Sequence, residues 1–579
     1  MDVHFVGDDP VRESVEAALS DVDIGLVDAS VDDLAEATVA IVTDVAGSPT
    51  IAQAARQARA GSTPWIAVEV GGIGGRTFTD LDAAITGFGP ETACYDCLRA
   101  RIGSTRESHT TTANPRADRA TVRLAGAIAG RECIRWFAGE GESIVGSIVE
   151  LPHARRELHP VEGCRCQSTG RDRSLDPTDD RERTLDETVD LMERAIDDRV
   201  GLVRSIGEVD SYPTPYYLAT LAETAAYSDV SAAQNAAGVD EDWNRAFVKA
   251  IGEGLERYCA GVYTDDDFTV SPAAKLESVV EPGDLVRPDD AETPGPDEPI
   301  SWVRGRDLRR DDPTYLPADA VHFPQPDGGV LPSITTGLGL GSSTADALVS
   351  GLTEVIERDA TMLAWYSTYD PLELELDDEA FDRLARRLSS EGLTVTPLLV
   401  TQDVDVPVVS VAVSRQGSNP AWPAFAVGSA ASLDVAAAAR DALAEAAQNW
   451  MELRSIGPDE ADDAGAWIGR YGRFPDAARS FVDAEATVDA STVGPAAPPT
   501  GAAAVSELLD RLDDAALDAF AAKLTTRDVA AIGFEAVRVV VPDAQPLFTD
   551  APFFGERARS VPESLGYEPR LDRDPHPYP

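Results

Sequence analysis

Short apolar runs alternate with amphipathic stretches over the first 140 residues. Apolar runs at 3–7, 37–45 and 64–72 have the length of buried strands, and helical periodicity covers 11–19, 51–60 and 116–138. Strands that alternate with helices are typical of a parallel sheet covered by helices, so this part predicts an α/β unit. The first run continues as GDDPVR and lacks the G-x-G-x-x-G turn of a dinucleotide site.

A polar and charged stretch at 168–184 interrupts this pattern and predicts a linker. A helical pattern begins at Leu185, and strands and helices then alternate through the rest of the chain. We therefore predict a mixed α/β (α+β) fold with a small domain at 1–170, a linker at 171–184 and a large domain at 185–579. No run approaches the roughly 18 apolar residues of a membrane helix, and the start lacks a secretory signal, so we expect a cytoplasmic protein without a membrane partner.

Acidic residues dominate the charge. The 579 residues include 101 Asp and Glu against 49 Lys and Arg, which gives a formal net charge of −52. The acids are spread along the chain and do not form blocks, which favours a solvated surface suited to concentrated salt over an acidic partner-binding surface. We expect a halophilic source. Binding to nucleic acid would need basic patches that this composition does not indicate.

Four of the six cysteines stand in two close pairs, Cys94 with Cys97 and Cys164 with Cys166. Zinc prefers four soft donors in a tetrahedron, and each pair pre-forms half of such a site. We predict a structural zinc ion held by all four. Four unrelated thiols and a redox C-x-x-C remain the alternatives. We expect the other two cysteines, at 133 and 259, to lie in the core.

An acidic motif occurs twice on apolar helical patterns, in AFVKAIGEGLERYC (246–259) and ALVSGLTEVIERDATMLAW (347–365). Each copy reads Glu-x-x-Glu-Arg, and the residues are Glu253, Glu256, Arg257, Glu354, Glu357 and Arg358. Carboxylates at i and i+3 share one face of a helix, and on a buried face they need a cation. Each helix could satisfy its acids with its own arginine. Two facing copies could instead present four carboxylates to Mg²⁺, which prefers oxygen ligands.

Magnesium held by acids in a cleft commonly carries a nucleotide triphosphate. No Walker motif occurs, but the glycine-rich TTGLGLGSS (335–343) precedes the second helix. Its backbone could approach a phosphate at the helix N-terminus, and by itself this loop is a weak signal.

With these motifs the chain resembles the YcaO family over residues 178–579. The matching segments are AAGVDEDWNRAFVKAIGEGLERYC, TTGLGLGSSTADALVSGLTEVIERDA and, as a third, AFAVGSAASLDVAAAARDALAEAAQ at 424–448. The resemblance implies that the large domain binds ATP with Mg²⁺ through elements other than a Walker motif. The implied Mg²⁺ ligands are Glu253, Glu256, Glu354 and Glu357.

The resemblance also implies a set of ATP and phosphate contacts. These residues are Arg183, Thr188, Lys249, Arg257, Ser342, Asp346, Arg358, Arg440, Glu445 and Gln448. The chain departs from the family pattern at three of its positions: Lys249 replaces a common serine, Ser342 an asparagine, and Ala237 the lysine of a G-K-G lead-in.

The N-terminal part resembles the ThiF-like, ubiquitin-activating-enzyme-like partner of azoline-forming YcaO proteins. It begins at its first strand, so we expect a truncated version without a preceding leader-binding module. The chain ends Pro575-His576-Pro577-Tyr578-Pro579, which fits the P-x-P-x-P tail of azoline-forming members. The resemblance implies a catalytic role for Pro575, Pro577 and Pro579. The alternative is a disordered proline-rich end. Residues 575–579 have no apolar periodicity, so we expect that they cannot contribute to a core.

The resemblance implies ATP-dependent cyclodehydration of Cys, Ser or Thr in a ribosomally made precursor peptide to azolines, as in the biosynthesis of thiazole/oxazole-modified microcins and other bacteriocins. Backbone thioamidation and an inactive peptide-binding scaffold are the alternatives. A separate leader-binding protein, a flavin dehydrogenase and a second copy in a homodimer are the implied protein partners.

Overall fold

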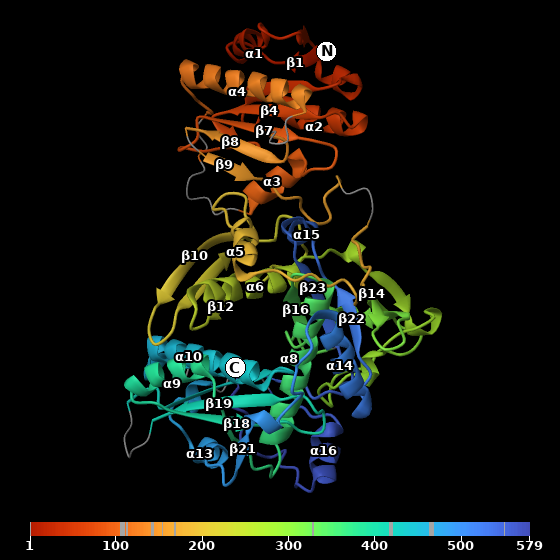
Figure 1. Ribbon diagram of the computed structural model, residues 1–579. Helices are drawn as coiled ribbons and strands as arrows, with labels where there is room; N and C mark the ends of the chain where they lie inside the picture. The colour runs from red at the N-terminus through yellow and green to blue at the C-terminus, as the bar shows by residue number, and fades with distance from the viewer. Residues whose placement is uncertain are drawn as a thin grey trace.

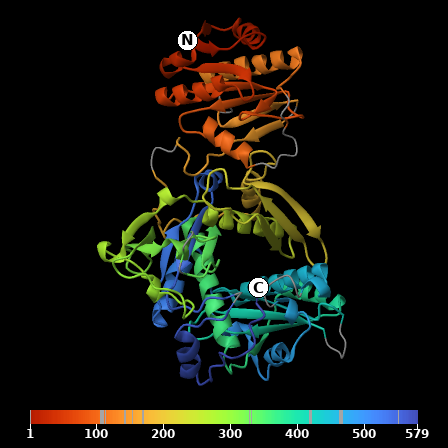
Figure 2. The same ribbon diagram turned by 180° about the vertical axis from the view of Figure 1, so that it is seen from behind.

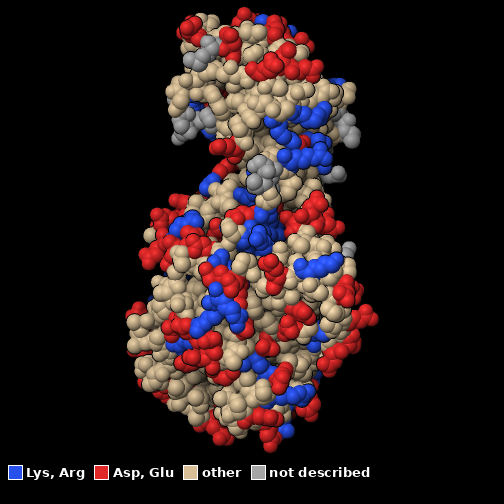
Figure 3. All heavy atoms as spheres, turned by 90° about the vertical axis from the view of Figure 1, so that its right-hand side faces the viewer, with Lys and Arg blue, Asp and Glu red and all other residues tan. Residues whose placement is uncertain are grey.

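The computed structural model describes residues 2–104, 111, 114–139, 144–152, 154–166, 170–326, 329, 331–415, 421–461, 468–548 and 551–578. Two regions lie one above the other, and they meet beside the helices α5 (Leu185–Glu193) and α15 (Arg527–Ile532) (Figure 1). None of the described helices is long and apolar enough to cross a membrane. Asp and Glu are scattered over the face of both regions that Figure 3 shows, as the even spread of acids along the sequence predicts.

The first region is built on a seven-stranded sheet with the order β2-β1-β3-β4-β7-β8-β9. Its strands are β1 (Asp2–Val6), β2 (Gly25–Asp28), β3 (Ala40–Val45), β4 (Trp65–Val70), β7 (Ala83–Phe88), β8 (Ser147–Leu151) and β9 (Ala154–Glu157). The four strands from β2 to β4 are parallel and the last three antiparallel. A small hairpin joins β5 (Gly72–Ile73) to β6 (Arg76–Thr77).

Helices cover both faces of this sheet. They are α1 (Val11–Leu19), α2 (Pro49–Gly61), α3 (Tyr95–Gly103) and α4 (Arg119–Ala138). Apolar residues of α1 and α4 form one core with the sheet, and those of α2 and α3 form another. The predicted strands and helices of this region are confirmed. The antiparallel half of the sheet was not predicted, because its strands lie beyond the alternating pattern.

The second region contains three sheets. The first has β10 (Val203–Asp210), β11 (Tyr216–Leu221) and β12 (Asn235–Val239). The second has the order β13 (Thr269–Pro272), β14 (Pro299–Asp307), β22 (Phe520–Lys523), β23 (Glu535–Val540) and β16 (Leu338–Gly341), with β15 (Pro313–Pro317) beside β14. The third has the order β20 (Phe425–Ala431), β19 (Val408–Ser414), β18 (Thr394–Leu399), β17 (Leu372–Glu375) and β21 (Thr487–Asp489).

The long helices of this region follow strands β12, β16 and β20. They are α6 (Trp243–Gly261), α8 (Thr344–Trp365) and α10 (Val435–Ile456). Shorter helices are α7 (Ala318–Val321), α9 (Glu379–Ser390), α11 (Pro458–Ala461), α12 (Ile468–Tyr471), α13 (Asp476–Val482), α14 (Gly501–Asp514) and α16 (Arg557–Leu565). The mixed α/β fold is confirmed, and both acidic motifs lie on helices.

The three strand–helix units form a closed arrangement that we call the ring. Helix α6 packs on its own strand β12 and on β16, α8 packs on β16 and β20, and α10 packs on β20 and β12. The three helices surround the centre of the second region in both ribbon views (Figures 1 and 2). Side chains that point inward from different units therefore meet, although they are far apart in the sequence.

Two irregular segments pack against the second region, and for the end of the chain this corrects the expectation. The predicted linker is irregular but attached, since Arg171 donates to the carbonyl of Val262 at 2.7 Å and Leu175 is buried. The end of the chain does contribute to a core, because His576 and Tyr578 are each 2% exposed and Tyr578 packs in the largest apolar cluster. A proline-rich stretch has no apolar periodicity, but its two aromatic side chains fill space between helices and strands.

Candidate functional site

In each unit of the ring, one glutamate of the helix accepts a hydrogen bond from a backbone amide in the preceding strand or directly before it. Glu253 accepts a hydrogen bond from the amide of Ala237 at 2.7 Å, Glu354 from Gly337 at 2.9 Å, and Glu445 from Ser429 at 2.6 Å. Donor and acceptor are separated by 16, 17 and 16 residues in the three units. The ring is thus a threefold repeat of one local design, and Glu445 is its third copy.

Glycines allow each helix to lie close to its strand. A Cβ atom at Gly238 would stand 2.2 Å from the amide of Ala250, and one at Gly339 would stand 2.2 Å from the carbonyl of Ala347. Side chains of Asp242, Ser343 and Asp434 cap the N-termini of the three helices. The glycine-rich run before the second helix therefore has a packing role, whatever else it binds.

Five carboxylates converge inside the ring, and we call Glu253, Glu256, Glu354, Glu357 and Glu445 the glutamate cluster. Burial and the carboxylates of Glu354 and Glu253 raise the pKa of Glu256 to about 8. Burial and Glu445 raise the pKa of Glu357 to about 8, against the opposing effect of Arg358. Negative charges that disfavour one another's ionisation in this way are stabilised by a bound cation.

Arginines compensate part of this charge. Arg257 forms an ion pair of 2.6 Å with Glu253, as the simpler interpretation of the motif predicted, while Arg358 stands 3.9 Å from Glu357. Arg538 on β23 is 4% exposed, and its Nε and Nη1 have no hydrogen-bond partner within the described part of the chain. Burial lowers the pKa of Arg538 to about 10, although Glu354 and Glu256 favour its charged form. Sequence reasoning missed Arg538, although a lone arginine in the apolar run EAVRVV was a visible signal.

A first cavity of about 570 Å³ opens beside the glutamate cluster. Eight of the predicted site residues line it: Thr188, Lys249, Glu253, Glu256, Ser342, Asp346, Glu445 and Gln448. Its charged lining consists of five carboxylates and one ammonium group, since Asp441 also belongs to it. Apolar side chains, among them Met192, Val248 and Phe534, form another part of the wall. A polyanion could enter this acidic space only together with cations.

Lys249 holds the wall of this cavity together across two units of the ring. Its ammonium group lies 2.8 Å from Asp240 and 2.9 Å from Asp441 on α10. The lysine that departs from the family's usual serine is therefore tied to two acids. Asp441 lines the first cavity and was also missed by sequence reasoning, because nothing in its motif distinguishes it from a surface acid.

A second cavity of about 1040 Å³ adjoins the first and shares Ala237, Glu253, Glu445 and Gln448 with it. Arg257 and Arg358 line this second cavity.

The remaining predicted residues of the large domain's ATP and Mg²⁺ set lie outside both linings. Glu354 and Glu357 are held by Gly337 and Ser429 behind the cavity walls. Arg183 donates to the carbonyl of Gly533 and stacks over Phe534, which itself lines the first cavity. Arg440 pairs with Asp378 at 2.6 Å.

The end of the chain approaches the same centre. Tyr578 and Ser410 form a hydrogen bond of 2.9 Å, and the indole of Trp365 donates to the carbonyl of Asp574. Tyr578 lies close enough to Glu357 and Glu445 for burial and these carboxylates to raise the pKa of its hydroxyl. Pro575 is half-buried and Pro577 buried, whereas Pro579 lies outside the described residues.

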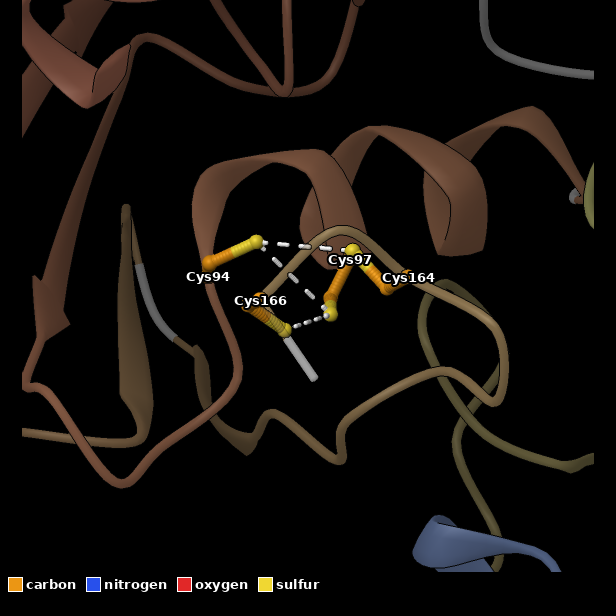
Figure 4. A group of neighbouring side chains, drawn as sticks. All are labelled: Cys94, Cys97, Cys164 and Cys166. Atoms are coloured by element: carbon orange, nitrogen blue, oxygen red, sulfur yellow. Dashed lines mark hydrogen bonds between the residues drawn. The ribbon is translucent and has the colours of Figure 1, made fainter. Parts of the chain in front are cut away.

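The four paired cysteines meet in one place, which we call the cysteine cluster (Figure 4). Their sulfurs lie 3.9 Å apart for Cys94 and Cys97, 3.6 Å for Cys94 and Cys164, and 3.5 Å for Cys97 and Cys166. Four sulfurs at the usual zinc distance form a tetrahedron with edges of about 3.8 Å. The donor set and its spacing therefore fit a zinc ion. Cys133 and Cys259 are fully buried elsewhere, as predicted.

Positive groups surround the cysteine cluster and connect it to the second region. Arg59 points at Cys94, and Arg527 on α15 donates to Cys166 at 3.4 Å. Hydrogen bonds from Cys164, the other thiols and Arg527 lower the pKa of Cys166. One turn after Cys97, the fully buried Arg101 forms an ion pair with the equally buried Asp528. The cysteine cluster thus stands at the junction of the two regions.

Residues 237–545, more than half of the chain, match the family model described as "YcaO cyclodehydratase, ATP-ad Mg2+-binding". The chain belongs to the YcaO family. The matched segment includes all five residues of the glutamate cluster and the three long helices of the ring.

Other proteins resemble this chain in sequence or in fold. An uncharacterized protein of Methanothermobacter thermautotrophicus is 29% identical over 341 residues, which cover 56% of this chain and 85% of the relative. A heterocyclase solved in complex with substrate and cofactor has a TM-score of 0.72 at 17% identity, over 98% of this chain and 83% of that chain. A YcaO protein from Methanopyrus kandleri, bound with AMPPCP and Mg²⁺, has a TM-score of 0.50 at 24% identity, over 64% of this chain and 95% of that one. These two structures show a shared fold, and the heterocyclase match extends it to the N-terminal region.

Proposed function

We propose that this YcaO protein is an ATP-dependent cyclodehydratase that converts Cys, Ser or Thr residues of a ribosomally made peptide to azolines. The observation that carries the proposal is the glutamate cluster beside an acidic cavity, in which a triphosphate needs Mg²⁺ to balance charge. The family membership and the second, adjoining cavity support it.

The nucleotide would enter the first cavity with its phosphates toward the glutamate cluster. Met192, Val248 and Phe534 offer apolar surface for the base, and Glu253, Glu256 and Glu445 offer carboxylate oxygens on the cavity side. Glu354 and Glu357 lie just behind them. Magnesium held there would neutralise phosphate charge during transfer of the terminal phosphoryl group.

The peptide supplies both reacting groups. The reacting side chain loses its S–H or O–H proton to solvent, its sulfur or oxygen attacks the preceding carbonyl carbon, and the carbonyl oxygen becomes an oxyanion. This oxyanion accepts the terminal phosphoryl group of ATP, which leaves ADP. Loss of the amide proton and of phosphate then forms the C=N bond of the azoline, so one water is removed per ring. Arg257 and Arg358, which face the second cavity, would stabilise negative charge on the transferring group.

The docked tail supports the azoline reaction over backbone thioamidation. His576 and Tyr578 are buried beside the ring, so residues 575–578 can shape the site as the P-x-P-x-P motif predicts. We propose that Pro575 and Pro577 act by fixing the course of this segment, since proline restricts φ to about −65°. The role of Pro579 follows from the motif alone.

Cys94, Cys97, Cys164 and Cys166 would hold a structural zinc ion. All four positions of the tetrahedron are filled by protein sulfur, so the ion would have no open position for chemistry. We propose that the first region, 1–170, joined through 171–184 to the large domain, serves as a peptide-docking domain. A separate leader-binding protein, a flavin dehydrogenase and a second copy of this chain remain the proposed partners.

An isotope experiment tests the reaction. A peptide with ¹⁸O in the carbonyl before its reacting cysteine is incubated with the protein, Mg²⁺, ATP and sulfide as a sulfur donor. We expect the peptide to lose one water and the ¹⁸O to appear in inorganic phosphate. Loss of water with unlabelled phosphate would contradict phosphorylation of the amide oxygen, and exchange of oxygen for sulfur would favour thioamidation.

A further inference from the structure

The mouth of the second cavity carries exposed apolar side chains. Val209 is 55% exposed, Leu218 38% and Ile456 39%, and all three line the cavity. We call them the apolar rim. Single exposed apolar residues need no explanation, but three around one cavity beside a nucleotide site offer a surface that a ligand can cover.

The fold holds the apolar rim in place from two sides. Val209 and Leu218 lie on β10 and β11, and Ile456 is the last residue of α10 on the opposite wall. The pairing of β10 with β11 shifts register between Glu208 and Asp210, so Val209 sits in a β-bulge. Bulges change the direction of a side chain and are frequent beside binding sites.

Several polar groups of the same walls are paired with one another. Tyr216 donates to Glu452 at 3.0 Å, and Gln448 donates to the same carboxylate at 3.0 Å. Arg454 pairs with Asp210 at 2.7 Å. The lining of the second cavity mixes apolar and polar side chains, and the apolar rim is its exposed apolar part.

We propose that the second cavity receives the substrate peptide and that the apolar rim binds an apolar side chain next to the residue that is cyclised. The inference rests on the proposed function, because the carbonyl to be phosphorylated must reach the boundary where the two cavities share Glu253 and Glu445. Leu218 of the apolar rim pairs across the sheet with Ala237, which lines both cavities, so the rim begins one strand away from that boundary. The site therefore selects peptides with an apolar residue beside the reacting Cys, Ser or Thr.

The test uses two synthetic peptides that contain one cysteine and differ only in whether Leu or Ser precedes it. A rim variant carries Val209→Ser, Leu218→Ser and Ile456→Ser. A control variant carries the same change at Val22, Val27 and Leu124, which are 38%, 43% and 51% exposed in the first region. Water loss is measured by mass spectrometry as a function of peptide concentration, and thermal unfolding verifies that both variants are folded.

The wild-type protein and the control variant should have a KM for the Leu peptide on the order of 10-fold lower than that for the Ser peptide. In the rim variant this preference should disappear through a higher KM for the Leu peptide. A rim variant that keeps the preference would overturn the cavity assignment while cyclodehydration stands. Absence of water loss from both peptides in the wild type, with binding of an ATP analogue intact, would instead contradict the proposed reaction, and the inference with it.

Discussion

The cysteine cluster and the glutamate cluster both gather side chains from distant segments, but they do so at different densities. Among the described residues, the four cysteines are the group whose ligand atoms all lie within 4.8 Å of one another. The glutamate cluster is not such a group, and three of its five members, Glu253, Glu256 and Glu445, line a cavity, so oxygen atoms from a ligand can complete the coordination of a metal there. A filled set of ligands is suited to holding a fold together, and an open set is suited to turnover.

The largest effect is expected from the closed site. Replacement of Cys97 by Ser, or chelation of the metal, should unfold the first region, because structural zinc contributes roughly 10 kcal/mol or more to folding. Metal analysis should find about one zinc per wild-type chain. The matched control is Cys133→Ser, a buried cysteine outside the cluster, which should retain the metal. If the purified wild-type protein contained no zinc and a chelator did not change its stability, the four thiols would be unrelated.

The open site should respond in activity while the fold survives. Glu253→Gln and Glu357→Gln keep size and remove charge, and each should lower ATP turnover by about 100-fold or more. Glu69→Gln is the control, since Glu69 is a buried carboxylate of the first region that bonds the amides of Gly74 and Gly75. If the two cluster variants had near-normal turnover and an unchanged circular dichroism spectrum, these acids would be paired core residues without a role in catalysis.

The tail should affect both the stability of the fold and the activity, whereas each of the two clusters should mainly affect one of them. Tyr578→Ala removes a fully buried ring and should lower the free energy of unfolding by about 4 kcal/mol, with loss of peptide modification. Tyr578→Phe loses only the hydroxyl bonded to Ser410 and should cost about 1 kcal/mol. Denaturant unfolding of both variants measures the difference, and equal stability of all three proteins would contradict the docked tail.

Acid should weaken the docking of the tail between pH 6.5 and about 4, the two pKa values of His576 in the unfolded and folded chain. Burial lowers the pKa of His576 from 6.5 to about 4, so the unfolded chain binds more protons than the folded one between these values. Stability from this residue is therefore complete above pH 6.5 and falls as the pH drops toward 4, by about 3 kcal/mol. His576→Gln should lose this part of the pH dependence while retaining that of the other buried histidines, His159 and His322. Identical pH profiles of unfolding would refute the assignment.

Local patterns in the sequence predicted the elements and the two clusters. The cysteine pairs and the Glu-x-x-Glu-Arg repeats lie on short segments whose spacing carries the chemistry, and the structure brings each set together. The alternation of strands and helices similarly predicted the parallel half of the first sheet.

Long-range pairing could not be predicted in the same way. Arg538 reaches Glu354 and Glu256 only because β23 pairs with β16, and the burial of Tyr578 depends on packing against residues more than 160 positions earlier. Lys249 appeared as a departure from a motif, and its contact with Asp441 exists only once α6 and α10 meet in the ring. Such contacts follow from topology, which no local window of sequence contains.

The central claim is that the glutamate cluster forms a site for Mg²⁺ and ATP together. Calorimetric titration with a non-hydrolysable ATP analogue tests it most directly, in the presence of Mg²⁺ and again in its absence. We predict saturable binding with one site per chain in Mg²⁺ and at least a tenfold loss of affinity without it, since five carboxylates line the first cavity. Equal affinity under both conditions, or no binding under either, would contradict the account.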